Sequence, residues 1–376
     1  MAFSLFQMAE LAQEQGDLIE AKRCYTASLL INRRLGDQGS PTLVLLPLGM
    51  LAQEQGKYAE ARQWYEEYRM YAERLGQQAP INLILQQLGE LAHEQGALVE
   101  AQQLYKESLA FAQNWNDELS IAEAQFRLGS LAEELGVADE ARKRYSEAHT
   151  AYERISAQDN VASTLHQLGL VARTLGDLTG AYERFAAAKD LFTSLGDDNM
   201  YDAEDQMMEL NNEAHELQEK RQRYEVQLAR AEFQVNHDAI AHRLYQLGQI
   251  AQAQGKATEA KMRYEASMAT FALLGKQRGM AQNWSALGIL AQRHGEITEA
   301  QRCYETALGL YKIVGDQSGT ALTLHQLGKL GIWCGQIEEA QRYYREAHIL
   351  YRQTGDSYGT ATTQRHLEGL FPRQAS

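Results

Sequence analysis

The chain has few cysteines, few prolines and no long apolar run, and each scarcity excludes a class of protein. Its three cysteines, Cys24, Cys303 and Cys334, are too few and too scattered for a disulfide framework or a zinc site. Cys24 and Cys303 share one repeat position, each just before a tyrosine, and we interpret them as buried packing thiols. No apolar stretch approaches the roughly 18 residues of a membrane-spanning helix. The N-terminus lacks the basic segment of a signal peptide. We therefore predict a cytoplasmic protein that makes no contact with membranes.

Positive charge is also scarce, since 50 acidic residues face 36 basic ones and the net charge is −14. Such a surface repels a phosphate backbone, which argues against nucleic-acid binding. The HExxH and GxSxG motifs are absent, and the glycine–lysine pairs at Gly56 and Gly255 lack the spacing and the hydroxyl residue of a P-loop. His237 and His242 are five residues apart, on different faces of a helix, so they do not suggest zinc. We predict no enzymatic activity, no cofactor and no metal.

Glycine is abundant, and its spacing reveals a repeat of 40 residues. Seven repeats contain a Leu-Gly pair, and a second glycine follows seven residues after the glycine of that pair. An alanine comes five residues later, and an aromatic residue four residues after that. The Leu-Gly glycines are Gly49, Gly89, Gly129, Gly169, Gly248, Gly288 and Gly328. A fixed period over most of the chain predicts one elongated array rather than separate globular domains.

Each position that recurs in the 40-residue repeat has a physical role in a helix–turn–helix unit, as the last repeat illustrates. Gly328 allows a second helix to approach closely, and Gly335 ends the first helix in the left-handed conformation. Ala340 is small where the two helices cross, and Tyr344 fills the space between successive units. The second helix ends at a further glycine. In several repeats an aspartate follows that glycine directly and is placed to cap the next helix: Asp37, Asp197, Asp316 and Asp356. No alternation typical of strands occurs, so we predict an all-α protein.

The succession Leu-Gly, Gly, Glu-Ala, Tyr and Ala-His-Ile-Leu over residues 327–350 resembles the tetratricopeptide repeat (TPR). The 40-residue units are similar to those of bacterial MalT-like and other STAND-type signalling ATPases, and of LGN/Pins-type adaptors. The resemblance implies a solenoid of helix–turn–helix units, wound as a right-handed superhelix whose first helices line a concave binding surface. We count about nine units and a C-terminal capping helix.

The array divides into units 1–5 over residues 1–199, an irregular segment over 200–239, units 7–9 over 240–359, and a capping helix with a tail over 360–376. In the irregular segment, Met208, His215 and Lys220 replace the two glycines and the alanine. One interpretation is a decayed repeat that turns at Asn211-Asn212, both tolerant of positive φ. The alternative is one long helix through the missing turn. In the cap, Pro372 should end the helix that begins near Thr360.

If the family geometry holds, four rows of residues face the groove. The first row lies three positions before each Leu-Gly glycine, and the other rows lie one, four and five positions after it. Some TPR domains clamp a C-terminal carboxylate with lysines and asparagines of the first two rows. Here the first row has neither residue type and the second row has no asparagine, which argues against that mode. We expect the partner-binding groove to include Phe6, Leu46, Met50, Glu54, Gln86, Glu90, His93, Glu94, Phe126, Glu134, His166, Arg173, Tyr245, Gln249, Ile289, Arg293, His325, Lys329 and Trp333.

The expected function is a non-catalytic scaffold that binds a partner protein or peptide in this groove. The glutamates of the first four units suit a segment with basic residues and apolar anchors. We expect the array to be the sensor or docking part of a larger bacterial signalling or defence system. The alternative is a structural solenoid that assembles through its ends, because Phe3 and Phe6 lie on a first helix with no preceding unit to cover them. Either a preceding domain or a second copy should cover these residues.

Overall fold

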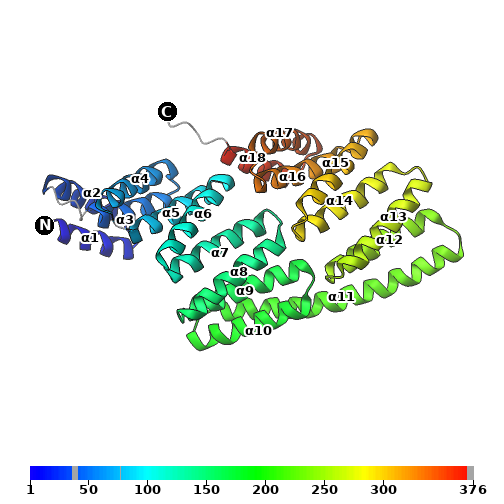
Figure 1. The fold of residues 1–376 in the computed structure, drawn as a ribbon, viewed down its shortest axis with the longest axis horizontal. Coiled ribbons are helices and arrows are strands. Elements are labelled where there is room, and N and C mark those ends of the chain that lie inside the picture. Colours follow the sequence, from blue (N-terminus) through cyan, green and yellow to red (C-terminus); the bar gives the residue numbers. More distant parts are fainter. Residues whose placement is uncertain (36–40, 77, 371–376) are drawn as a thin grey trace. The chain divides into compact units, whose positions relative to one another are not determined.

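The computed structural model describes residues 1–35, 41–76 and 78–370, and this part of the chain contains 18 α-helices and no strand (Figure 1). Consecutive helices pack in pairs, first helix against second helix, as the repeat predicted. The helices are α1 Ala2–Glu14, α2 Leu18–Leu35, α3 Pro41–Glu54, α4 Tyr58–Leu75, α5 Gln78–Glu94, α6 Leu98–Trp115, α7 Glu118–Glu134, α8 Ala138–Arg154, α9 Gln158–Leu175, α10 Leu178–Leu195, α11 Asn199–Phe233, α12 His237–Ala253, α13 Ala257–Leu273, α14 Gln277–Arg293, α15 Ile297–Val314, α16 Gln317–Trp333, α17 Ile337–Thr354 and α18 Ser357–Leu370.

The helices form two compact units. Unit 1 comprises Met1–Ala124 together with the described residues from Glu368 onward, and unit 2 comprises Gln125–Leu367. Helix α7 crosses the boundary between them. The first helices of the repeats are α1, α3, α5, α7, α9, α12, α14 and α16, and all of them except α1 carry the Leu-Gly pair. The second helices α2, α4, α6, α8, α10, α13, α15 and α17 carry the aromatic residue.

The Leu-Gly glycine and the aromatic residue of the same repeat pack against each other. A Cβ atom at Gly49 would lie 2.2 Å from Cε1 of Tyr65, and a Cβ atom at Gly328 would lie 2.7 Å from Cε1 of Tyr344. The close approach that the sequence predicted is therefore made by an aromatic ring rather than by the backbone of the second helix. The same contact recurs at Gly89, Gly129, Gly169, Gly248 and Gly288.

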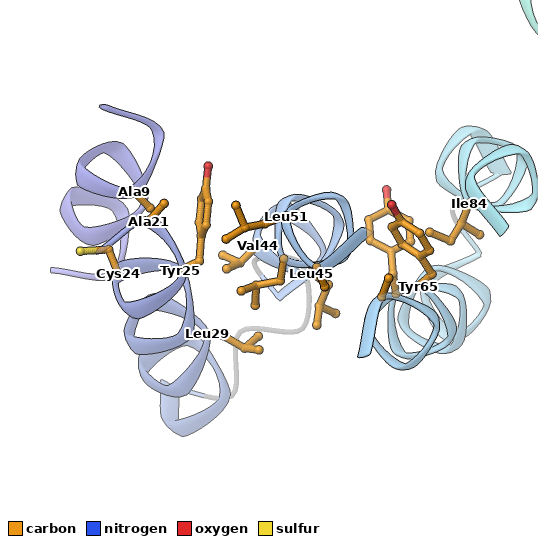
Figure 2. Close-up of a cluster of buried hydrophobic side chains, with 14 of the residues drawn as sticks. Ala9, Ala21, Cys24, Tyr25, Leu29, Val44, Leu45, Leu51, Tyr65 and Ile84 are labelled. Atoms are coloured by element: carbon orange, nitrogen blue, oxygen red, sulfur yellow. The ribbon is translucent and has the colours of Figure 1, made fainter. Parts of the chain in front are cut away.

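The aromatic ring also fills the space between successive repeats. Figure 2 shows Tyr25 between its own helix pair and the side chains of Val44 and Leu51 on α3. Tyr65 occupies the equivalent place beside Ile84 of α5. Both tyrosines are fully buried. Since each repeat shares its aromatic residue with the next one, the core is continuous along a unit, as in other repeat arrays.

The predicted turns form where the structure describes them. Gly335 has a φ of 74° and donates its N–H to the carbonyl of Ile332, while the next N–H reaches the carbonyl of Gly331, as in a Schellman motif. Asp316 and Asp356 cap α16 and α18 by accepting from the N–H three residues on. Asp197 instead accepts from the N–H of Asn199. Asp37 and Pro372 lie outside the described residues.

Residues 199–233 form a single helix of 35 residues, so the interpretation as a decayed helix–turn–helix unit is wrong. Asn211 and Asn212 lie inside this helix, α11, and form no turn. The N-terminal part of α11 packs Met207 and Leu210 against α9 and α10, as a first helix would. Its C-terminal part packs against α12, as a second helix would. The two helices of one repeat have merged: His215 stands where the other repeats have the turn glycine, and Asn211 and Asn212 remain helical.

Candidate functional site

The row of predicted groove residues three positions before the Leu-Gly glycine lies largely against the aromatic core. Ring centroids are 5.7 Å apart for Phe6 and Tyr25, 5.2 Å for Phe126 and Tyr145, and 5.7 Å for Tyr245 and Tyr264. The same row places His166 on Phe185 and His325 on Tyr344. Leu46 packs on the core of unit 1, and Gln86 is buried. This row therefore contributes mainly to packing.

The row four positions after the glycine holds the tyrosines in place by hydrogen bonds. The hydroxyl of Tyr65 donates to Gln53 at 2.9 Å, that of Tyr264 to Gln252 at 2.7 Å, and that of Tyr304 to Gln292 at 2.7 Å. Tyr25 and Tyr145 do the same with Gln13 and Glu133. The 12-residue spacing between acceptor and tyrosine is visible in the sequence and could have identified this structural role.

Two predicted residues of that row, His93 and Arg173, are used differently. His93 is half-buried, with its ring edge against Tyr105. Arg173 has no tyrosine to serve, because Phe185 stands at that place in its repeat. Its guanidinium instead binds Glu213 at 2.8 Å and Glu209 at 3.0 Å, both on α11. Arg173 therefore joins α9 to the long helix.

In unit 1, the predicted groove residues one and five positions after the Leu-Gly glycine are more exposed to solvent than those of the other two rows. Met50, Glu54 and Glu94 are exposed, and Glu90 is half-buried. Glu94 accepts a hydrogen bond from Gln53 at 2.8 Å. Among the described residues, Glu54 and Glu94 form no ion pair, and neither do Glu10 and Glu14 on α1. The first-helix face of unit 1 therefore carries a row of glutamates without cationic partners, which we call the acidic row: Glu10, Glu14, Glu54 and Glu94.

The second helices of unit 1 show the opposite arrangement, since their glutamates are paired with cations of the neighbouring repeat. Lys22 binds Glu60 at 2.6 Å, and Arg62 binds Glu100 at 2.5 Å. Arg33 and Glu67 form a further bridge. These pairs neutralise the second-helix face within the chain. The glutamates of the acidic row, by contrast, form no ion pair among the described residues.

In unit 2, several predicted groove residues take part in a contact between distant parts of the chain. The side chain of Gln292 donates to the carbonyl of Leu135 at 2.6 Å, and His294 lies 2.9 Å from Asp139. A Cβ atom at Gly176 would lie 1.9 Å from the backbone nitrogen of Gly255. Trp333 packs on the cluster that surrounds Tyr145. We call this region, where the ends of α7–α9 meet α12, α14 and α16, the inner contact.

The long helix explains why the inner contact forms. Arg173 of α9 binds α11 at Glu209 and Glu213, while Arg221 of α11 binds Gln254 and Glu259 beyond the end of α12. The turns that follow α9 and α12 are thus held near the middle of the same helix, and their glycines meet. A cavity of about 470 Å³ lies beside them, lined by Asp139, Arg142, Asp177 and His294, among others.

The other predicted groove residues of unit 2 lie at or near this region. Glu134 binds Arg365 of α18 at 2.5 Å. Arg293 is half-buried beside Leu175 and Gly255, and burial lowers the pKa of its guanidinium. Ile289 and Lys329 are half-buried, and Gln249 is exposed. Nothing in the 40-residue period signals the inner contact, since it joins residues of non-adjacent repeats, such as Gly176 with Gly255 and Leu135 with Gln292.

Alanine at Gly176 should destabilise the protein more than alanine at Gly56. Both glycines have positive φ, so both substitutions carry a strain of about 1 kcal/mol. At Gly56 the new methyl group meets no atom within 4 Å, whereas at Gly176 it meets backbone. Thermal denaturation followed by circular dichroism measures the difference. Equal shifts for the two variants would contradict the inner contact.

Helix α1 exposes several apolar side chains. Phe3 is 68% exposed and Met8 and Leu11 are 54% exposed, whereas Phe6 is half-buried against Tyr25. The expectation that a further domain or a second copy covers Phe3 and Phe6 stays a prediction. Within the described ranges, no helix combines the length and apolarity needed to cross a membrane, and no group of three or more potential metal ligands occurs.

Comparison with known proteins gives a match to one repeat family over part of the chain. The family model of the tetratricopeptide repeat matches residues 1–74 and 238–313. No curated protein matches the sequence significantly. Among solved structures, the chain is similar to a STAND protein with a tetratricopeptide repeat sensor from Pyrococcus horikoshii, with 11% identity and a TM-score of 0.41, over 99% of this chain and 50% of that one. It is also similar to the apo form of RapI, with 8% identity and a TM-score of 0.40, over 84% of this chain and 99% of that one. A Rap protein complexed with competence and sporulation factor has 12% identity and a TM-score of 0.37, over 98% and 97% of the two chains.

Proposed function

Since the chain carries tetratricopeptide repeats, we propose that it is an interaction scaffold that binds a basic, partly apolar segment of a partner protein on the first-helix face of unit 1. The observation that carries this proposal is the acidic row, whose four glutamates have no cationic partner among the described residues. Repeat arrays of this kind present extended surfaces built from successive units. A row that spans three first helices suits an elongated ligand rather than a small molecule.

Charge complementarity selects the ligand. On the second helices, lysine and arginine side chains of the chain itself pair with glutamates such as Glu60 and Glu100. Lysine or arginine side chains of a partner would pair with the glutamates of the acidic row in the same way. Met50, which is 48% exposed and lies about one helical turn before Glu54 on α3, offers an apolar contact on the same face. The ligand is therefore a segment that alternates basic and apolar residues.

The wider role follows from the type of repeat. Arrays of 40-residue units occur as sensors in the STAND-type ATPases that the sequence resembles. We propose that this scaffold docks a partner within a larger bacterial signalling or defence system, with the recognition step on unit 1.

Reversing the charge of Glu54 and Glu94 should weaken binding of a basic peptide at least tenfold, roughly 1.4 kcal/mol, because two attractive charges become repulsive. The probe is a fluorescent peptide of alternating lysine and leucine, and fluorescence anisotropy at low and high salt measures its affinity. Salt should weaken binding to the unmodified protein strongly.

The matched control reverses Glu66 and Glu107, which are exposed on the second helices α4 and α6. This control changes the net charge by the same amount but leaves the acidic row intact. If both double variants lost affinity equally, the peptide would be responding to overall charge, and the assignment of the binding face would be wrong.

A further inference from the structure

A polar cluster lies where α16, α17 and α18 meet in unit 2, and its hydrogen-bonding groups are incompletely satisfied. Tyr344 is fully buried and its hydroxyl has no partner among the described residues. His366 is 1% exposed and its Nδ1 atom has none either. The ring of His366 stacks on Tyr344 with centroids 4.9 Å apart, and the ring of His325 lies edge-on to both. We call these residues, together with Lys329 and Arg365, the α18 cluster.

The repeat itself explains why Tyr344 has no partner. In five other repeats, the residue 12 positions before the tyrosine accepts its hydroxyl proton, as Gln252 and Gln292 do. In the last repeat that position is Ile332, which has no acceptor. A buried hydroxyl without a partner is unfavourable, so an acceptor from elsewhere is expected at this place.

The charged members of the α18 cluster specify an anionic acceptor. Lys329 forms no ion pair among the described residues, and burial lowers the pKa of its ammonium group. Buried cations are unfavourable without a counter-charge. Lys329 and Arg365 can only donate hydrogen bonds and attract negative charge, whereas the Tyr344 hydroxyl and each neutral histidine can donate one hydrogen bond and can also accept. The cluster therefore has donors and cations in excess.

Glu134, at the end of α7, partly supplies the missing charge. Its carboxylate binds Arg365 at 2.5 Å. Its negative charge also acts to raise the pKa values of Lys329, His366 and Tyr344, so all three lie within its electrostatic reach. The pair remains partly exposed, with 57% of the Arg365 side chain accessible to solvent. Partly exposed ion pairs are weak and can be exchanged.

We propose that the α18 cluster is a binding site for the acidic side chains of a peptide, and that Glu134 occupies this site as an internal competitor until such a peptide displaces it. An incoming glutamate or aspartate would replace one carboxylate by another, so little additional charge is desolvated. The Tyr344 hydroxyl and Lys329 would then gain the acceptor they lack. This ligand is opposite in charge to the one proposed for unit 1, so different peptides test the two proposals.

The test measures the binding of fluorescein-labelled hexaglutamate with an amidated C-terminus to the full chain by fluorescence anisotropy. The substitution Glu134→Gln removes the competing carboxylate. It should tighten peptide binding about three- to tenfold, because a larger fraction of the α18 clusters is then free to bind the peptide. Tyr344→Phe and Lys329→Gln should each weaken it by about tenfold, since each removes a donor. Tyr344→Phe keeps the ring that fills the core, so this variant tests binding without disturbing the packing.

Two controls make the result decisive. Glu265→Gln, on the exposed face of α13, removes the same charge as Glu134→Gln and should leave the affinity unchanged. A hexaglutamine peptide with a free C-terminus tests whether a terminal carboxylate suffices. The proposal is overturned if Glu134→Gln and Glu265→Gln behave alike, if Tyr344→Phe and Lys329→Gln bind as the unmodified chain does, or if hexaglutamine binds as tightly as hexaglutamate.

Discussion

Alanine at Gly288 should lower the stability of the protein by about 2 kcal/mol, because the new methyl group has no room. It would lie 2.6 Å from Cδ1 and Cε1 of Tyr304. That ring is buried, and its hydroxyl is bound to Gln292, so it cannot move aside without breaking a hydrogen bond. The helix propensity of alanine recovers only about 1 kcal/mol of the cost.

The matched control is Gly309, which lies inside α15 with no atom within 4 Å of its would-be Cβ. Alanine at Gly309 should stabilise the protein by about 0.5–1 kcal/mol, since only the helix propensity changes. Urea denaturation of both variants gives the two free energies of unfolding. Changes of the same sign would show that the glycine–aromatic contact does not restrict the Leu-Gly position.

Acid should destabilise unit 2 well before its surface carboxylates are protonated, because two buried histidines resist protonation. Burial lowers the pKa of His325 to about 3 and that of His366 to about 4, with smaller contributions from neighbouring cations. In the unfolded chain both titrate near 6.5, so the unfolded state binds more protons below that pH. The stability that the neutral histidines provide is therefore complete above about pH 6.5 and is lost as the pH falls toward 4.

The expected loss between about pH 7 and pH 5 is roughly 1–2 kcal/mol for each histidine. The groups that face them are Lys329, Arg365, Glu134, Tyr344 and Tyr351. Of these, only Glu134 is a carboxylate. Its negative charge acts to raise the pKa of His366, but burial lowers that pKa by more. Thermal denaturation at both pH values measures the effect.

The double variant His325→Phe and His366→Phe should lose most of this pH dependence, since phenylalanine keeps a ring in each place but does not titrate. His215→Gln, which changes an exposed histidine of α11, is the control and should behave as the unmodified protein does. An unchanged pH profile in the double variant would assign the acid sensitivity to other groups.

The helix pairs, their turns and the buried alanine and aromatic positions were predictable from the sequence alone. Each depends on interactions within one repeat or between adjacent repeats, so a single 40-residue period encodes them. The Leu-Gly glycine at Gly328 faces Tyr344 only 16 residues away, and the turn at Gly335 depends on its own φ. Ala340 is fully buried beside Gly331, where α16 and α17 cross, as its small size indicated.

The candidate binding residues were harder to predict, because the period gives a residue's register but not its partner. Gln53 and Gln252 share the register of groove residues but serve as acceptors for buried tyrosines. The contrast between the paired glutamates of the second helices and the unpaired acidic row became visible only when cross-repeat ion pairs such as Lys22 with Glu60 were known.

By itself, the sequence determined an all-helical repeat with glycine-defined turns, since those features arise from local conformation and from contacts between neighbouring helices. The tertiary structure decided that residues 199–233 form one helix and that Glu134, Gln292 and Trp333 of unit 2 join an internal contact. The physical reason is the helix length, about 52 Å for 35 residues at 1.5 Å each. That length allows Arg173 and Arg221 to hold distant turns against one helix, an arrangement that no local pattern encodes.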